Sequence, residues 1–93
     1  MKKLILLLLF IPLASFGQTW VFNKYFENGQ LDTEASFKNG KQVGLLKFYY
    51  QSGQLQEEHF YKNDQLNGQG TYTYADGEIV RGIWKNGELE TAN

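Results

Sequence analysis

NGQGTYTYADGEIVRGIWKNGEL, residues 67–89, decides the fold of this chain. Two runs of aromatic or β-branched residues, each alternating with other residue types, are separated by Asp76-Gly77 and closed by Asn86-Gly87. Asn-Gly and Asp-Gly tolerate the positive φ angles that tight hairpin turns require. Alternation of period two between such dipeptides therefore predicts a pair of antiparallel strands.

The chain before this stretch repeats the same plan twice, with a spacing of 24 residues. Residues 25–31, YFENGQL, fall on residues 49–55, YYQSGQL. The third unit is one residue shorter between its turn glycine, Gly77, and the aromatic residue Trp84. The first two units are therefore expected to place their extra residue in a β-bulge between the turn and the aromatic residue. Repeats at a short fixed period indicate stacked units that bury apolar surface only against their neighbours.

We therefore predict an all-β domain over residues 18–93, built as a meander of successive β-hairpins. The three units cover about residues 22–44, 46–68 and 69–89. Seven dipeptides are expected at hairpin turns: Asn28-Gly29, Asn39-Gly40, Ser52-Gly53, Asn63-Asp64, Asn67-Gly68, Asp76-Gly77 and Asn86-Gly87. The acidic segment after Glu88 is expected to fray.

Alternation also assigns side chains to the two faces of the sheet. One face is expected to carry aromatic residues from all three units, and we call it the aromatic face: Phe26, Phe37, Phe48, Tyr50, Tyr61, Tyr72, Tyr74 and Trp84. Two interpretations stay open. The rings form a core, or they line a partly exposed groove that binds a peptide or a glycan by stacking. The edge strands are a second candidate site, because an exposed edge can pair with another chain.

Residues 1–17 have the three-part pattern of a secretory signal peptide. Lys2 and Lys3 precede an apolar run, and the small residues Ser15 and Gly17 stand at the −3 and −1 positions of a cleavage site before Gln18. The alternative is a membrane anchor, for which the apolar run falls short of the about 20 residues that span a bilayer. We expect cleavage near Gly17/Gln18 and export to the periplasm, the cell envelope or the medium.

Composition excludes several classes of partner and chemistry. Cleavage would remove two of nine basic residues and leave all ten acidic ones, so the remaining charge is negative and a nucleic-acid partner is not expected. His59 is the only histidine and there is no cysteine, so no metal site and no cofactor are expected.

The sequence also argues against catalysis. Glu57 and Glu58 are neighbours in a predicted strand, so their carboxylates should point to opposite faces and cannot act together on one glycosidic bond. Residues 68–70, GQG, lack the lysine and the following helix of a phosphate-binding loop. We therefore expect a protein that is not an enzyme.

The third unit resembles the MORN repeat, whose pattern is GxGxYxYADGxxYxGxWKNG. The matching residues are Gly68, Gly70, Tyr72, Tyr74, Ala75, Asp76, Gly77, Gly82, Trp84, Lys85, Asn86 and Gly87. The tyrosine before the late glycine is Val80 here. Residues 25–44 and 49–68 resemble the MORN variant of YwqK-type proteins, except that Ala35 and His59 replace its glycine and Asp64 replaces its turn glycine.

This resemblance implies an all-β fold that is a single-layer, twisted antiparallel meander of successive β-hairpins, and it implies a role in protein interaction or assembly. We therefore expect an exported, non-enzymatic module that contacts a protein partner or a second copy of itself. A membrane-surface, phospholipid- or glycan-binding module is the alternative, using the same aromatic residues. A second alternative is an antitoxin or immunity component, which is the label that YwqK-type proteins carry.

Overall fold

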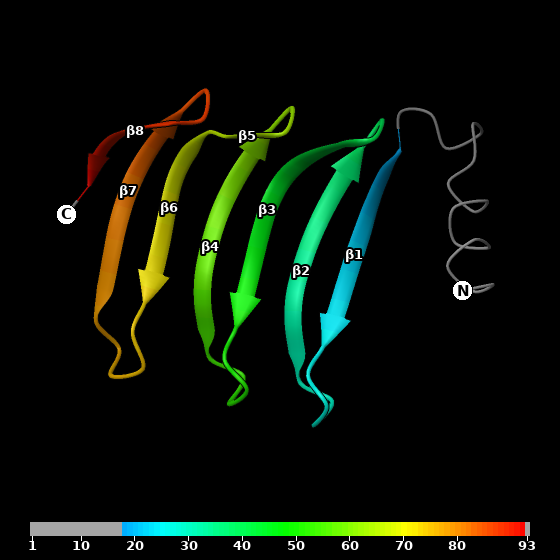
Figure 1. Ribbon diagram of the computed structural model, residues 1–93, viewed down its shortest axis with the longest axis vertical. Helices are drawn as coiled ribbons and strands as arrows, with labels where there is room; N and C mark the ends of the chain where they lie inside the picture. The colour runs from blue at the N-terminus through cyan, green and yellow to red at the C-terminus, as the bar shows by residue number, and fades with distance from the viewer. Residues whose placement is uncertain (1–17, 93) are drawn as a thin grey trace.

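The computed structural model describes residues 18–92, which form one antiparallel sheet of eight strands (Figure 1). The predicted signal peptide lies outside the described residues. The strands are β1 (Thr19–Tyr25), β2 (Leu31–Lys38), β3 (Lys41–Tyr49), β4 (Leu55–Lys62), β5 (Gln65–Leu66), β6 (Gly68–Thr73), β7 (Ile79–Lys85) and β8 (Glu88–Ala92).

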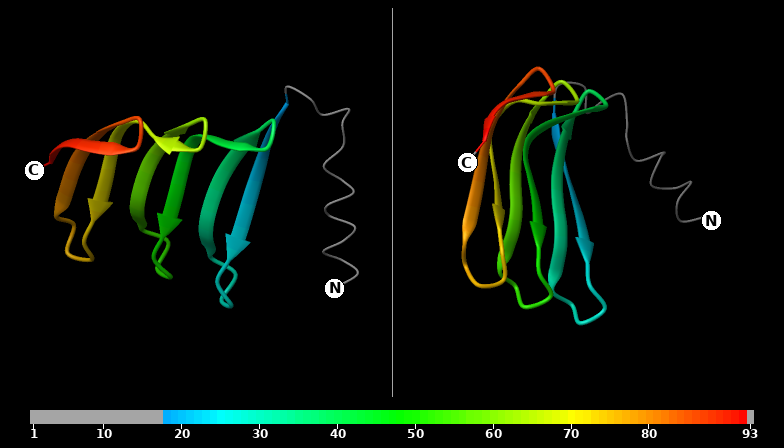
Figure 2. Two further views of the ribbon diagram at one scale, coloured as in Figure 1. Left: turned by 45° about the horizontal axis from the view of Figure 1, so that its top comes forward. Right: turned by 60° about the vertical axis from the view of Figure 1, so that its left-hand side comes forward.

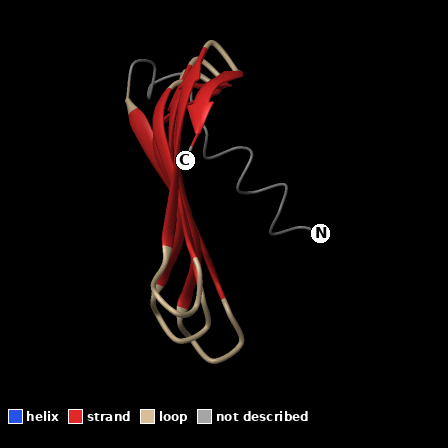
Figure 3. Ribbon diagram, turned by 90° about the vertical axis from the view of Figure 1, so that its left-hand side faces the viewer, coloured by secondary structure: helices blue, strands red, loops and turns tan. Residues whose placement is uncertain are grey.

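The strands follow one another across the sheet in the order β1-β2-β3-β4-β6-β7-β8, with β5 paired to the end of β4. Viewed along its edge, the sheet is a single twisted layer, and no other element of residues 18–92 packs on either face (Figure 3). The predicted meander of hairpins is thus confirmed. The segment after Glu88 was expected to fray, and this expectation is wrong: it forms β8, which pairs with β7 from Lys85↔Glu88 to Gly82↔Ala92.

The short turns at one end of the sheet confirm the predicted tight hairpins. Both central residues have positive φ at Asn39-Gly40 (54° and 79°), Asn63-Asp64 (49° and 69°) and Asn86-Gly87 (51° and 86°). At the opposite end the turns are longer, and only their glycines have positive φ. Each of these turns repeats the same pair of backbone hydrogen bonds, for example Tyr74 N to Glu78 O and Gly77 N to Tyr74 O, both 2.8 Å.

The extra residue of the first two units lies where the repeat spacing predicts it. Between Lys24↔Thr33 and Tyr25↔Leu31, β2 advances two residues while β1 advances one, so Asp32 is the additional residue. The same step occurs in the second unit, where Gln56 is additional. In the third unit the register from Gly68↔Trp84 to Thr73↔Ile79 is continuous.

Asn67-Gly68 does not form a hairpin turn, which corrects the prediction for this dipeptide. Gly68 has a φ of 95° and lies at the break between β5 and β6, where β5 pairs Tyr61↔Leu66 and β6 resumes with Glu57↔Tyr72. The break turns β5 across the end of the sheet, and β8 runs in the same direction (Figure 2). The positive φ of Gly68 therefore serves a bend between β5 and β6 here, and not a hairpin turn.

Hydrogen bonds join the second and third short turns to the unit before them. Asp64 N donates to Gln42 O at 2.9 Å, and the Asp64 carboxylate accepts from Gln42 N at 2.7 Å. Gly87 N donates to Leu66 O at 2.9 Å. This bond explains why Asp64 can stand where the variant repeat has a turn glycine. Asp tolerates positive φ, and its carboxylate accepts from a backbone N–H that glycine would leave without a partner.

A single sheet without a second layer has little interior. Among the described residues, Ala35 is the only buried hydrophobic side chain, and no side chain is fully buried. The remaining apolar side chains are half-buried against their neighbours in the sheet or exposed. Within residues 18–92, no helix has the length and apolarity needed to cross a membrane.

Candidate interaction face

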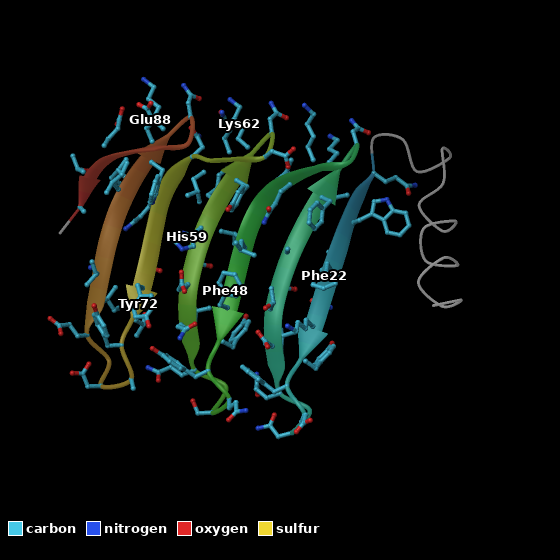
Figure 4. All side chains as sticks on the ribbon, in the orientation of Figure 1. Phe22, Phe48, His59, Lys62, Tyr72 and Glu88 are labelled. Carbon is cyan, nitrogen blue, oxygen red and sulfur yellow. The ribbon has the colours of Figure 1, made fainter. Side chains whose placement is uncertain are left out.

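The strand register brings the predicted aromatic residues onto one face. Phe48 lies opposite Glu57, Glu57 lies opposite Tyr72, and Tyr72 lies opposite Val80. Directly opposed residues share a face, and so do residues two apart in a regular strand. Phe37, Tyr61 and Trp84 follow on that face by alternation. Phe22, Phe48, His59 and Tyr72 cross the middle of the sheet, whereas Lys62 and Glu88 lie at the end with the short turns (Figure 4).

Three tyrosines from two units form the most connected part of the aromatic face. The Tyr72 and Tyr74 rings lie edge to face, with centroids 5.0 Å apart and an angle of 65° between their planes. The Tyr50 hydroxyl donates to Thr73 O at 2.7 Å and so bridges the second unit to the third. Phe26 holds the equivalent position in the first unit, with the same turn hydrogen bond, Phe26 N to Gln30 O at 2.8 Å.

A hydrogen bond with the Tyr50 hydroxyl raises the pKa of Tyr72 above its ordinary value of 10.0, and partial burial and the charge of Glu57 act in the same direction. Tyr72 therefore keeps its phenolic proton at neutral pH. The hydroxyls on this part of the face offer a partner hydrogen-bonding groups beside the flat rings.

His59 and Glu57 also belong to this face, although neither was among the predicted interaction residues. His59 Nε2 lies 3.0 Å from Glu57 Oε1, and both side chains are partly buried. The two residues are two apart in β4, so alternation places them side by side. Alternation along the sequence already places both residues on this face, whereas Glu58 between them points to the other face.

The third unit contains a flat platform made by two glycines. Gly70 lies directly opposite Gly82. A Cβ on Gly70 would be 2.5 Å from His59 Nδ1 and 3.4 Å from Trp84 Nε1, and a Cβ on Gly82 would be 3.7 Å from Trp84 Nε1. The absence of two side chains thus lets the indole edge and the imidazole approach the backbone.

The opposite face is different in character. A polar row crosses it through the pairs Glu34↔Lys47 and Lys47↔Glu58, with Lys47 Nζ and Glu58 Oε2 3.9 Å apart. Its larger apolar side chains are exposed, with Leu45 directly opposite Phe60 and with Val21 and Ile83 on other strands. The connected rings therefore distinguish the aromatic face as the candidate site.

The aromatic face offers stacking surfaces, hydroxyls and one carboxylate–imidazole pair. The face is neither a closed core nor a deep groove: most of its rings are half-buried, and Tyr74 is 48% exposed. Within residues 18–92, no three His, Cys, Asp or Glu side chains are grouped to hold a metal ion. The groups present suit recognition by contact area and hydrogen bonds.

Comparison with known families agrees with this geometry. Residues 21–39 and 42–63 match the MORN repeat variant, and residues 60–79 match the MORN repeat. No curated protein and no solved structure gives a significant match. The matched segments span the hairpins from β1 to the start of β7. The chain belongs to the MORN-repeat family, with variant repeats within residues 21–63 and a standard repeat at residues 60–79.

Proposed function

We propose that this chain is an exported, non-enzymatic repeat module that binds a protein partner through its aromatic face. The observation that carries the proposal is the exposure of that face. Its half-buried rings are held in a fixed register by the sheet, Tyr74 is 48% exposed, and no second layer of residues 18–92 covers them. MORN repeats in general serve contacts with proteins or membranes, which agrees with this use.

The charges on the aromatic face favour a protein over an anionic lipid. Lys24 and Glu57 lie in the same row across this face, so the row offers one cation and one anion. Lys38, Lys41 and Lys62 lie at the end of the sheet with the short turns. A lipid headgroup would need several cations near the rings, whereas tyrosine and tryptophan with a few polar groups are typical of protein-binding surfaces.

Affinity capture from the cell envelope fraction tests the proposal. The immobilised protein should retain a protein partner, and Tyr74→Arg should reduce its recovery at least tenfold, because Tyr74 is exposed and lies at the tyrosine cluster. Phe60→Arg is the matched control: Phe60 is 43% exposed on the opposite face. Far-ultraviolet circular dichroism should show that both variants keep the sheet.

Equal recovery by the wild type and the Tyr74→Arg variant would contradict the assignment of the binding face. Retention by liposomes or by a glycan array, with no protein captured, would favour the membrane-surface or glycan alternative instead. Capture of the product of an adjacent gene that can be deleted only together with this one would specify the partner as a toxin, in keeping with the label of YwqK-type proteins.

A further inference from the structure

The first strand of the sheet is an exposed edge with little protection. All seven residues of β1 are exposed, and Val21, Phe22 and Tyr25 show 56%, 51% and 57% of their surface. Its pairing with β2 is regular from Thr19↔Lys38 to Lys24↔Thr33. Natural edge strands are usually short, bulged or charged, because a long regular edge pairs with other chains. Lys24 is the one charged residue in β1.

The other edge of the sheet has the protections that β1 lacks. β8 has five residues and includes Glu88 and Glu90. Its pairing with β7 is interrupted by a register shift between Ile83 and Trp84. Carboxylates and an irregular register both oppose the addition of another strand. The two edges therefore differ, and β1 is the one suited to pairing.

We propose that β1 pairs with β1 of a second copy of this chain, forming a two-fold symmetric dimer with one continuous sheet. Two identical neighbouring strands related by a two-fold axis perpendicular to the sheet run antiparallel. Such an axis places one residue opposite itself and keeps the same face on the same side in both copies. Phe22 is the middle residue of Thr19–Tyr25, so this register uses the whole strand.

The register centred on Phe22 gives complementary neighbours throughout β1. Lys24 of one copy lies opposite Trp20 of the other, which is a favourable pairing of a cation with an aromatic ring. Val21 lies opposite Asn23, and Phe22 opposite its own copy. No like charges oppose each other, whereas a register centred on Lys24 would place two ammonium groups together.

Charges near the edge are complementary in the same arrangement. At the end with the short turns, the hairpin nearest β1 carries Lys38 and Lys41, and at the other end the turn after β1 carries Glu27, with Asp32 at the start of β2. The two-fold axis exchanges these ends. It therefore places Lys38 of each copy about two strand spacings, roughly 10 Å, from the end of β1 that leads to Glu27 of the other copy, which is about one Debye length. Lys41 and Asp32 lie farther from the opposite charges of the other copy, where salt screens the attraction.

This dimer goes beyond the proposed function, because it uses an edge and leaves the aromatic face free. The two aromatic faces would lie on the same side of the joined sheet and offer a partner twice the surface. Failure of the dimer would leave the proposed binding face intact. Failure of affinity capture would likewise leave the dimer intact.

Single cysteine variants test the dimer, because the natural chain contains no cysteine. With glutathione disulfide as oxidant, Phe22→Cys should form a disulfide-linked dimer, since directly opposed residues have Cβ atoms about 4.5–5.5 Å apart. The controls are three exposed positions elsewhere: Phe60→Cys and Tyr74→Cys on the two faces, and Leu89→Cys on the other edge. These should remain monomeric on non-reducing gels.

Sedimentation of the unmodified protein gives a second measurement that does not depend on any substitution. At high concentration it should show twice the mass of one chain. On dilution the mass should fall to that of one chain. The proposal is overturned if the unmodified protein sediments as a monomer at every concentration. It is also overturned if cysteine at position 60, 74 or 89 links two chains more readily than cysteine at position 22.

Discussion

Trp84→Ala is expected to lower the free energy of unfolding by about 3 kcal/mol, the lower part of the range for removing a large aromatic side chain, because Trp84 is half-buried. Its indole nitrogen lies within 3.7 Å of the positions that Cβ atoms on Gly70 and Gly82 would occupy. Removing the indole would expose the backbone of both glycines, in a sheet that has no other layer to compensate.

Chemical denaturation of the wild type and two variants measures this effect. Ile83→Ala is the matched control, because Ile83 is the neighbouring residue in β7, points to the opposite face and is 41% exposed. It should cost about 1 kcal/mol. If Trp84→Ala were no more destabilising than Ile83→Ala, the indole would not be the main support of the third unit.

Gly70→Ala should destabilise the protein by about 1–3 kcal/mol through steric conflict. Its φ lies outside the left-handed region, so alanine fits the backbone, but the new Cβ would be 2.5 Å from His59 Nδ1. The imidazole must move, and the contact of Nε2 with Glu57 at 3.0 Å would be lost with it. Gly82→Ala should cost less, because its nearest neighbour is the flexible end of Leu89 at 3.1 Å.

A double-mutant cycle with His59→Ala isolates the steric cause. In the His59→Ala background the space above residue 70 is open, so Gly70→Ala should become nearly neutral, with a coupling energy of about 1 kcal/mol or more. An unchanged cost of Gly70→Ala in that background would show that the imidazole is not what the glycine accommodates.

Much of the fold follows from local sequence signals. Asn39-Gly40 and Asn86-Gly87 favour positive φ at two successive residues. Between two strands, this conformation is typical of a tight hairpin turn. The count of residues between the turn glycine and the aromatic residue was enough to predict a bulge in that segment of the first two units, because an added residue in one strand has no partner in the other. The strand register identifies the added residues as Asp32 and Gln56.

The errors came from features that depend on pairing between distant segments. Asn67-Gly68 has the same conformational preference as a turn dipeptide, but Tyr61↔Leu66 and Glu57↔Tyr72 pair on its two sides and make it a bend within the sheet. β8 was expected to fray because Glu88 and Glu90 are acidic, yet its backbone pairs with β7. Local propensity does not contain these long-range hydrogen bonds.

The sequence predicted which residues form the aromatic face but not how far their side chains are buried. Alternation placed Tyr72 and Trp84 on one side of the sheet, and the register agrees. The family resemblance implied a single layer, but how far each ring is buried depends on its neighbours across the strands, so core and groove both stayed open. The hydrogen bond of Tyr50 to Thr73 likewise depends on the spacing between units and not on either unit alone.

Oxidative footprinting of the purified protein tests most directly that the aromatic face is open and binds a partner. In the free protein, Tyr74 on this face should be modified as readily as Phe60 on the opposite face, since they are 48% and 43% exposed. Adding the captured partner should protect Tyr74 and leave Phe60 reactive. Protection of Tyr74 already in the free protein, or its full reactivity in the complex, would contradict the account.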